Sequence, residues 1–219
     1  KAAAPCEVGF APVGIVKAPA SDSPRDVEAA RQAMFSITAG NVWNNTWWMD
    51  PVFHGTYPDD GLRLFEQYLP ATWQHDMATI AAKLDFFGTN IYSCEAAAAG
   101  PQGTPTLVTR PYGWPMTAFR WPVTPEALYW GPKFFAERYG LPVYLTENGM
   151  SGTDWVALDG KVHDPQRIDF ITRYLRELAR AITDGVDIRG YFHWSLMDNF
   201  EWAEGYSQRF GIIHVDYST

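Results

Sequence analysis

Cysteine and histidine are scarce in this 219-residue sequence, and their positions argue against two common kinds of site. The two cysteines, Cys6 and Cys94, provide neither a disulfide framework nor a metal-binding spacing. The five histidines are scattered along the chain and form no ligand pair, so we expect no zinc site. No predicted strand is followed by the G-x-G-x-x-G fingerprint of a dinucleotide site. The sequence therefore predicts a protein that works without a metal or a cofactor.

Positive charge and long apolar runs are also lacking. The 17 lysines and arginines are outnumbered by 25 acidic residues, which leaves a formal net charge of -8 and a pI near 5.0. Nucleic-acid binding is disfavoured because it needs a basic face. No apolar run approaches the roughly 20 residues of a membrane span. We expect no nucleic acid and no membrane as partners, and a cytoplasmic location.

Aromatic residues, in contrast, are abundant, at 16% of the chain with ten tryptophans. They are concentrated in residues 191–210 (YFHWSLMDNFEWAEGYSQRF), where large rings alternate with acids such as Asp198 and Glu201. A site for a polyhydroxylated ring needs flat apolar faces for stacking and ionised acceptors for hydroxyl donors. The alternative is an aromatic-rich core segment whose acids point into solvent.

Hydrophobic periodicity and capping residues predict helices that alternate with strands. We expect helices at residues 24–37 (capped by Ser23), 72–82, from Pro125 onward (capped by Thr124) and 165–184. Strands are expected at residues 8–16 (interrupted by Pro12), 84–92, 141–146 and 186–194. Residues 41–58 are interpreted as a helix that runs into a loop, and residues 95–120 as a long loop.

The most regular of these helices spans residues 165–184, with Asp164 as its predicted cap. Apolar residues recur along it at spacings of 3, 4, 3 and 4, namely Ile168, Ile171, Leu175, Leu178 and Ile182. This spacing predicts a single buried stripe. The four arginines at positions 167, 173, 176 and 180 lie off the stripe, so we expect them on a solvated surface.

The alternation of strands and helices, with strands that are apolar nearly throughout, is typical of parallel strands covered on both faces. Polar or aromatic residues follow three strands in turn: Asn90 and Tyr92 on one, Glu147 on the next and Trp194 on the third. The active-site face of a (β/α)8 barrel is built from the carboxyl ends of its strands. An open doubly wound sheet would also use carboxyl ends, but together with a glycine fingerprint for phosphate. The pattern favours the barrel.

Four motifs, in order along the chain, resemble those of glycoside hydrolase family 1, the β-glucosidase family. Leu-Thr-Glu-Asn-Gly (145–149) resembles the nucleophile motif, and residues 193–206 resemble the sugar-recognition loop. Residues 85–92 are similar to the sixth strand and residues 121–128 to the entry of the helix that follows it. The resemblance runs from about Gly14 to Tyr217. It implies that residues 1–219 form the C-terminal half, strands 5–8, of a TIM barrel, with the N-terminal half and final helix outside this chain.

The resemblance implies a retaining β-glucosidase that hydrolyses terminal non-reducing β-D-glucosyl residues. Glu147 would be the nucleophile that attacks the anomeric carbon and forms a covalent glycosyl-enzyme. Tyr92 would donate a hydrogen bond to Glu147, and Asn90 would lie close by in support. An exposed turn acid is the alternative for Glu147.

The remaining residues implied by the resemblance would bind the substrate. Trp194 would lie beneath the sugar ring, and Glu201 would accept from its outer hydroxyls, with Trp202 beside it. Trp121 would line the leaving-group side and Phe210 would close the wall, although core packing is an alternative for both. A carboxylate at position 201 would repel the phosphate of a 6-phosphoglycoside. We therefore expect a neutral β-glucoside or short β-linked oligosaccharide as the substrate, with galactosides or fucosides as side activities.

One element of the family pattern is missing from the sequence. The general acid/base of the family is a glutamate in an Asn-Glu-Pro motif, and this tripeptide does not occur here. We expect the N-terminal half of the same enzyme, as a separate chain, to supply it. Two alternatives remain, namely an inactive carbohydrate-binding fragment and a half-barrel that associates with itself.

Overall fold

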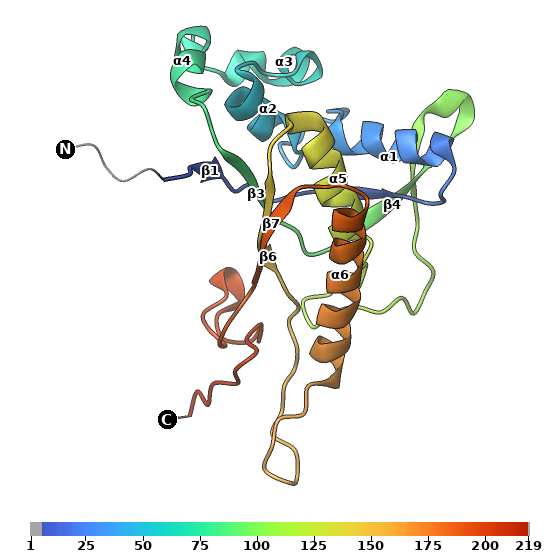
Figure 1. Ribbon diagram of the computed structural model, residues 1–219, viewed down its shortest axis with the longest axis vertical. Helices are drawn as coiled ribbons and strands as arrows, with labels where there is room; N and C mark the ends of the chain where they lie inside the picture. The colour runs from blue at the N-terminus through green and yellow to red at the C-terminus, as the bar shows by residue number, and fades with distance from the viewer. Residues whose placement is uncertain (1–5, 219) are drawn as a thin grey trace, which may run out of the picture.

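The computed structural model describes residues 6–218, and its main sheet confirms the mixed α/β architecture. Four parallel strands lie side by side in chain order: β1 (Gly9–Phe10), β3 (Phe86–Asn90), β6 (Val143–Asn148) and β7 (Ile188–His193). Figure 1 shows α5 and α6 packed together beside this sheet. Because neighbouring strands are parallel, their carboxyl ends meet at one edge, as in a (β/α)8 barrel. The first predicted strand is reduced to two residues, after which Val13 pairs in isolation with Asn90.

Each predicted helix is present, and the helix at Asp59–Phe65 is an additional one that was not predicted. The helices are α1 (Pro24–Phe35), α2 (Thr46–His54), α3 (Asp59–Phe65), α4 (Trp73–Ile80), α5 (Ala127–Tyr139) and α6 (Pro165–Thr183), with short 3-10 turns at Glu66–Tyr68, Pro101–Gly103 and Trp202–Glu204. The predicted cap of α1 is confirmed, because Ser23 Oγ accepts from the Asp26 amide at 3.1 Å. Asp164 is the N-cap residue of α6, as predicted, but its side chain makes no capping hydrogen bond, and the cap predicted at Thr124 is wrong. Thr124 Oγ1 accepts instead from the Cys94 amide, and the Asp164 carboxylate accepts from Arg167.

A second sheet corrects the prediction that residues 95–120 form a loop. Strand β4 (Cys94–Ala99) pairs in parallel with β2 (Val16–Pro19) and antiparallel with β5 (Pro105–Val108). The alanines of β4 carry little strand propensity, which is why the sequence pattern missed them. Their small side chains let α1 pack closely, and Ala97 lies fully buried with Ala29 and Ala30 of that helix.

Residues 41–58 contain a helix that runs into a short loop, as predicted, but a further loop precedes this helix, which begins only at Thr46. The preceding loop ends at Asn45, whose buried amide bonds to both backbone groups of Ile15 and to the Met34 carbonyl. Helix α2 begins at the next residue and buries Trp47 and Met49. A buried side chain that satisfies three backbone groups decides where the chain turns, and periodicity cannot reveal such a contact.

The buried face of α6 also differs from the prediction. Ile168 is 65% exposed and Ile182 is 50% exposed, whereas the buried residues are Arg167, Phe170, Tyr174, Leu178 and Ala181. The aromatic pair explains the rotation, because Phe170 and Tyr174 stack with ring centroids 3.8 Å apart. The Tyr174 hydroxyl accepts from the Thr124 amide and donates to the Tyr92 carbonyl. The predicted solvated arginine at position 167 is therefore wrong.

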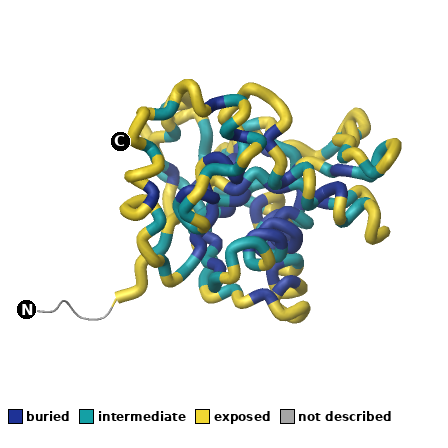
Figure 2. Tube along the Cα trace, turned by 90° about the horizontal axis from the view of Figure 1, so that it is seen from above, coloured by how far each residue is buried: buried dark blue, intermediate teal, exposed yellow. Residues whose placement is uncertain are grey.

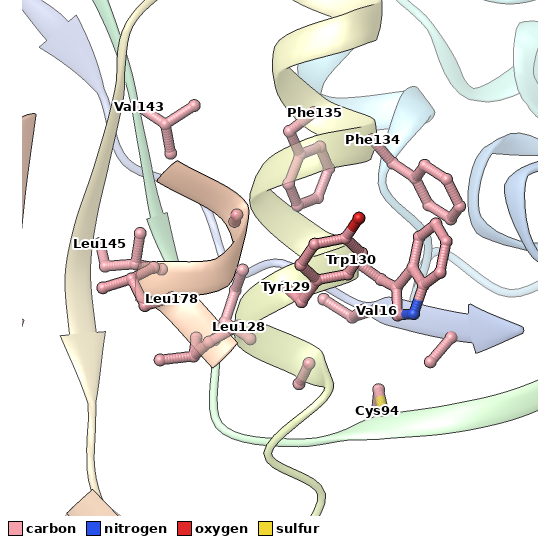
Figure 3. Packing of buried hydrophobic residues seen from close by; sticks show 14 of the residues in the cluster. Val16, Cys94, Leu128, Tyr129, Trp130, Phe134, Phe135, Val143, Leu145 and Leu178 are labelled. Carbon is pink, nitrogen blue, oxygen red and sulfur yellow. The ribbon is translucent and has the colours of Figure 1, made fainter. Parts of the chain in front are cut away.

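The core lies between the main sheet and α5. Figure 3 shows Phe134 and Phe135 of α5 directed into the cluster, together with Val143 and Leu145 of β6 and Leu178 of α6. The rings of Phe87 and Phe135 lie 4.8 Å apart, so β3 and α5 are joined by aromatic contact. Figure 2 shows the buried residues gathered in the interior, with exposed segments around them. This packing leaves the carboxyl edge of the strands to the functional residues.

Candidate active site

Glu147 and Tyr92 meet at the carboxyl edge of the main sheet. Glu147 lies near the end of β6, where it pairs in register with Asn90 at the end of β3. Tyr92 lies two residues after Asn90 in the chain, and its hydroxyl donates to Glu147 Oε2 at 2.5 Å. A hydrogen bond of this length to a carboxylate is of the charge-assisted kind. The structure thus brings together the two residues predicted to be catalytic.

The phenol of Tyr92 is held in its neutral, donating form. Burial is the main reason that its pKa lies above the ordinary value for tyrosine, since a phenolate would be poorly solvated there. The hydrogen bond to Glu147 and the negative charges of Glu147 and Glu201 raise the pKa of Tyr92 further. Tyr92 is therefore a permanent donor to the carboxylate.

Asn90 lies beside this pair rather than in direct hydrogen bonding with it. Its Oδ1 accepts from the Thr146 hydroxyl at 2.7 Å, which connects the ends of β3 and β6. Asn90, Tyr92 and Trp121 line one open cavity of about 390 Å³, which we call the site cavity. Asn90 therefore lies close to the pair, and its supporting role stays a prediction.

A wall of rings surrounds Tyr92. The ring of Trp121 lies 4.9 Å from Tyr92 and 6.0 Å from Phe210. Phe210 is only 2% exposed, so it backs the wall rather than presenting a face to the cavity. Sequence reasoning missed Phe119, whose ring lies 4.6 Å from Trp121. No sequence signal marked Phe119, because it lies in a turn in which Arg120 has a positive φ of 60° and no regular period applies.

Trp194 and Glu201 form a second group next to β6. The indole Nε1 of Trp194 donates to Glu201 Oε2 at 3.4 Å, and the Trp194 amide donates to the Asn148 carbonyl. A Cβ atom at Gly149 would lie 1.8 Å from the Trp194 carbonyl oxygen, so only glycine permits this approach. Trp202 is separate from the group, at 83% exposure.

The sequence pattern misjudged the role of Asp198. Its buried carboxylate accepts from the Gly211 and Val215 amides and from Arg209, so it organises the loop after β7 instead of facing a ligand. Arg167 of α6 joins this network by donating to Asp154 and to the Arg209 carbonyl. These bonds fix the backbone on either side of Phe210 and hold the aromatic wall in place.

Residues 6–218 contain neither a metal-binding cluster nor a membrane-spanning helix. Within that range, no group of three or more histidine, cysteine, aspartate or glutamate side chains could hold a metal ion. Both cysteines are free, and burial raises the pKa of Cys94 to about 12, so its thiol stays protonated. In the same part of the chain, no helix has the length and apolar character needed to cross a bilayer.

The parallel strands bring a carboxylate, its phenol partner and aromatic rings to one edge of the sheet. This combination of fold and site is typical of barrel glycosidases. The sequence profile of glycosyl hydrolase family 1 matches residues 2–219. The chain therefore belongs to glycosyl hydrolase family 1.

Individual relatives agree with this assignment. A 1,4-beta-D-glucan glucohydrolase of Thermotoga neapolitana is 42% identical over 203 residues, which make up 92% of this chain and 46% of the relative. A bifunctional beta-D-glucosidase/beta-D-fucosidase of Bifidobacterium breve is 37% identical over 200 residues, 80% of this chain and 42% of the relative. The solved family 1 β-glucosidase from Thermotoga maritima with isofagomine lactam matches at a TM-score of 0.77 and 40% identity, over 97% of this chain and 47% of that structure. The chain spans about half the length of these relatives.

Proposed function

We propose that this chain is the nucleophile-bearing, C-terminal half of a retaining β-glucosidase. The observation that carries the proposal is the 2.5 Å hydrogen bond from Tyr92 to Glu147 within the Leu-Thr-Glu-Asn-Gly motif. By donating to one oxygen of the Glu147 carboxylate, the neutral phenol of Tyr92 orients the carboxylate. The second carboxylate oxygen stays available to attack an anomeric carbon. The ring of Trp121 lies beside Tyr92 and lines the site cavity, and Phe210 lies behind it.

The proposed reaction has two steps. Glu147 attacks the anomeric carbon and forms a glycosyl ester, while the aglycone leaves with the electron pair of the glycosidic bond and takes up a proton. Water then hydrolyses the ester. Both steps need an acid/base carboxyl about 5–5.5 Å from the nucleophile. The sequence has no Asn-Glu-Pro motif, so we assign this group to the N-terminal half of the enzyme as a separate chain.

The sheet supports a partner of this kind. The four parallel strands begin with β1 and end with β7, and closure of a (β/α)8 barrel takes eight strands. A second set of strands would pair with the outer edges of β1 and β7, which in an open sheet present unpaired backbone groups. The length of the relatives, about twice that of this chain, is consistent with such a partner.

The substrate-binding roles follow from the same assignment. Trp194 would stack beneath the glucosyl ring, while Glu201, held by the Trp194 indole, would accept from its outer hydroxyls. Trp202 would cover the ring edge once a substrate is bound, and Trp121 would line the leaving-group side with Asn90 nearby. A carboxylate at Glu201 favours neutral β-glucosides over phosphorylated ones. Fucosides are a reasonable second substrate, given the Bifidobacterium relative, and a cytoplasmic location remains a prediction.

Complementation tests the proposed function. This chain should be co-expressed with the N-terminal region of the Thermotoga maritima β-glucosidase and assayed with a chromogenic β-glucoside. We expect native mass spectrometry to show two dissimilar chains in one complex, and hydrolysis only when both are present. A homodimer of this chain without a second polypeptide would support the self-associating alternative. Sugar binding without hydrolysis in the two-chain complex would support the carbohydrate-binding alternative.

Changing Tyr92 to phenylalanine tests the role of its hydroxyl. A hydrogen bond to a charged group contributes about 1.5–3 kcal/mol, so we expect kcat of the assembled enzyme to fall about 10–100-fold with little change in KM. The pKa of Tyr92 is raised above its ordinary value. The hydroxyl therefore stays protonated even at a pH at which a free tyrosine would ionise. The alkaline limb of the pH–rate profile should therefore keep its position in the variant. A displaced alkaline limb would show that Tyr92 titrates during turnover and contradict its role as a neutral donor.

A further inference from the structure

Strand β6 contains one more residue than either neighbouring strand at the position of Glu147. The register shows this on both sides, through the pairs Thr89–Leu145 and Asn90–Glu147 with β3, and Tyr191–Leu145 and His193–Asn148 with β7. One step along β3 thus corresponds to two along β6, and two steps along β7 correspond to three. Such an extra residue is a β-bulge, and a bulge next to an active site redirects a side chain.

The bulge decides where the side chain of Glu147 points. Val143 and Leu145 are fully buried in the core between the main sheet and α5. Alternate side chains of a regular strand share a face, so a regular β6 would direct Glu147 into the core as well. With the extra residue, the half-buried Glu147 side chain turns out of the core and reaches the hydroxyl of Tyr92.

Asn148 connects the bulge to the end of β3. Its side chain is fully buried, and its Nδ2 donates to the Ile91 carbonyl at 2.8 Å. The Ile91 amide in turn donates to the Glu147 carbonyl at 2.9 Å, and Ile91 directly precedes Tyr92. The segments that carry Glu147 and Tyr92 are therefore bonded to each other twice, once through the backbone and once through the Asn148 side chain.

Tyr191 of β7 fixes the orientation of the Asn148 amide. A carbonyl can only accept, so the Asn148 group that faces Ile91 must be the NH2 group, and Oδ1 points to the other side. There the Tyr191 hydroxyl donates to Oδ1 at 3.0 Å, whereas His193 Nδ1 is farther from this hydroxyl, at 3.4 Å. Burial raises the pKa of Tyr191 to about 12, so the hydroxyl keeps its proton. Asn148 thus bridges β3 and β7 across the bulge.

We infer that Asn148 and Tyr191 are positioning residues for Glu147, because together they hold the β-bulge that directs its carboxylate toward Tyr92. Neither side chain lines the site cavity, so both act on the reaction through Glu147. The inference rests on the proposed function for the reaction that Glu147 performs, but the hydrogen bonds that it concerns all lie within this chain.

Proton NMR of this chain tests the inference without requiring turnover. A hydroxyl proton in a 2.5 Å bond to a carboxylate resonates far downfield, and the Tyr92 signal is identified as the one lost in Tyr92→Phe. In Tyr191→Phe and in Asn148→Leu, we expect this signal to move upfield, because the carboxylate is no longer held against the phenol. An unchanged Tyr92 signal in either variant would overturn the inference.

Tyr129→Phe is the matched control. Tyr129 of α5 is also buried, and its hydroxyl donates at 2.7 Å to Asp184, where α6 ends. The same chemical group is therefore removed from a buried hydrogen bond outside the bulge. Both tyrosine variants should lose some thermal stability, but only Tyr191→Phe should move the Tyr92 signal.

Kinetics of the assembled two-chain enzyme add a measurement that a loss of stability alone would not change. We expect Tyr191→Phe to lower kcat for a chromogenic β-glucoside about tenfold at unchanged KM, while Tyr129→Phe keeps the wild-type kcat. Once Asn148→Leu is present, adding Tyr191→Phe should lower kcat no further, since the hydroxyl acts through Asn148. A second tenfold loss in the double variant would contradict the inference. Absence of hydrolysis by the wild-type complex would refute the proposed function instead, and the Tyr92 signal would still decide on the positioning.

Discussion

Replacing Glu147 by glutamine is expected to lower kcat/KM of the assembled enzyme for an aryl β-glucoside by at least about 10³-fold. The amide keeps the size of the side chain and can still accept from Tyr92, but it has no charge with which to attack the anomeric carbon. The loss should appear in kcat, because the residues proposed to hold the sugar, Trp194 and Glu201, are unchanged. Steady-state kinetics with a chromogenic β-glucoside measure both constants.

A second glutamate provides the control for this substitution. Glu177→Gln makes the same chemical change on α6, where Glu177 pairs with Arg180 at the surface. Its activity should equal that of wild type. If Glu147→Gln retained more than about a tenth of the wild-type kcat, Glu147 could not be the nucleophile.

Replacing Arg167 by methionine is expected to lower the free energy of unfolding by about 3–5 kcal/mol, the usual effect of breaking a buried ion pair. The guanidinium is 2% exposed and donates to Asp154, Asp164 and the Arg209 carbonyl. Methionine fills much of the volume but leaves the 8%-exposed Asp154 carboxylate without its cation. Urea denaturation followed by circular dichroism gives the change, provided that the slope with denaturant stays constant.

Arg173→Met on the same helix is the reference for this measurement. Arg173 pairs with Asp169, and both side chains are more than half exposed. A surface pair of this kind contributes about 0–1 kcal/mol, so the reference should unfold close to wild type. Equal losses for the two variants would contradict the assignment of Arg167 as the buried link between α6 and the loop after β7.

The sequence predicted β3, β6 and β7 well because these strands are apolar and alternate with helices along the chain. It failed for β4, whose alanines carry no strand signal and are explained only by the close approach of α1. In α6, two faces of the helix have apolar residues at helical spacing. The face that contains Ile168 looked more hydrophobic in the sequence than the face that contains Phe170, which is the buried one. The stacking of Phe170 on Tyr174 and the hydrogen bonds of Tyr174 decide between them, and these are tertiary contacts.

The candidate site was also predicted only in part. The meeting of Tyr92 and Glu147 followed from motif resemblance together with the rule that parallel strands share a carboxyl edge. Asp198 was misjudged because a carboxylate among aromatic residues looks the same in sequence whether it faces a ligand or backbone amides. The sequence also does not show which of three tryptophans within six residues is buried: Trp47 is 5% exposed, whereas Trp43 is 69% exposed.

Covalent trapping of the glycosyl-enzyme tests the central claim most directly. A 2-deoxy-2-fluoro-β-D-glucoside with a dinitrophenolate leaving group should be used, because this group departs without protonation and the trapped ester hydrolyses slowly. We predict one fluoroglucosyl adduct per copy of this chain in the two-chain complex, located by peptide mass spectrometry at Glu147 and absent from Glu147→Gln. An adduct on Glu201 or another carboxylate, or no adduct in a complex that hydrolyses β-glucosides, would contradict the assignment of Glu147 as the nucleophile.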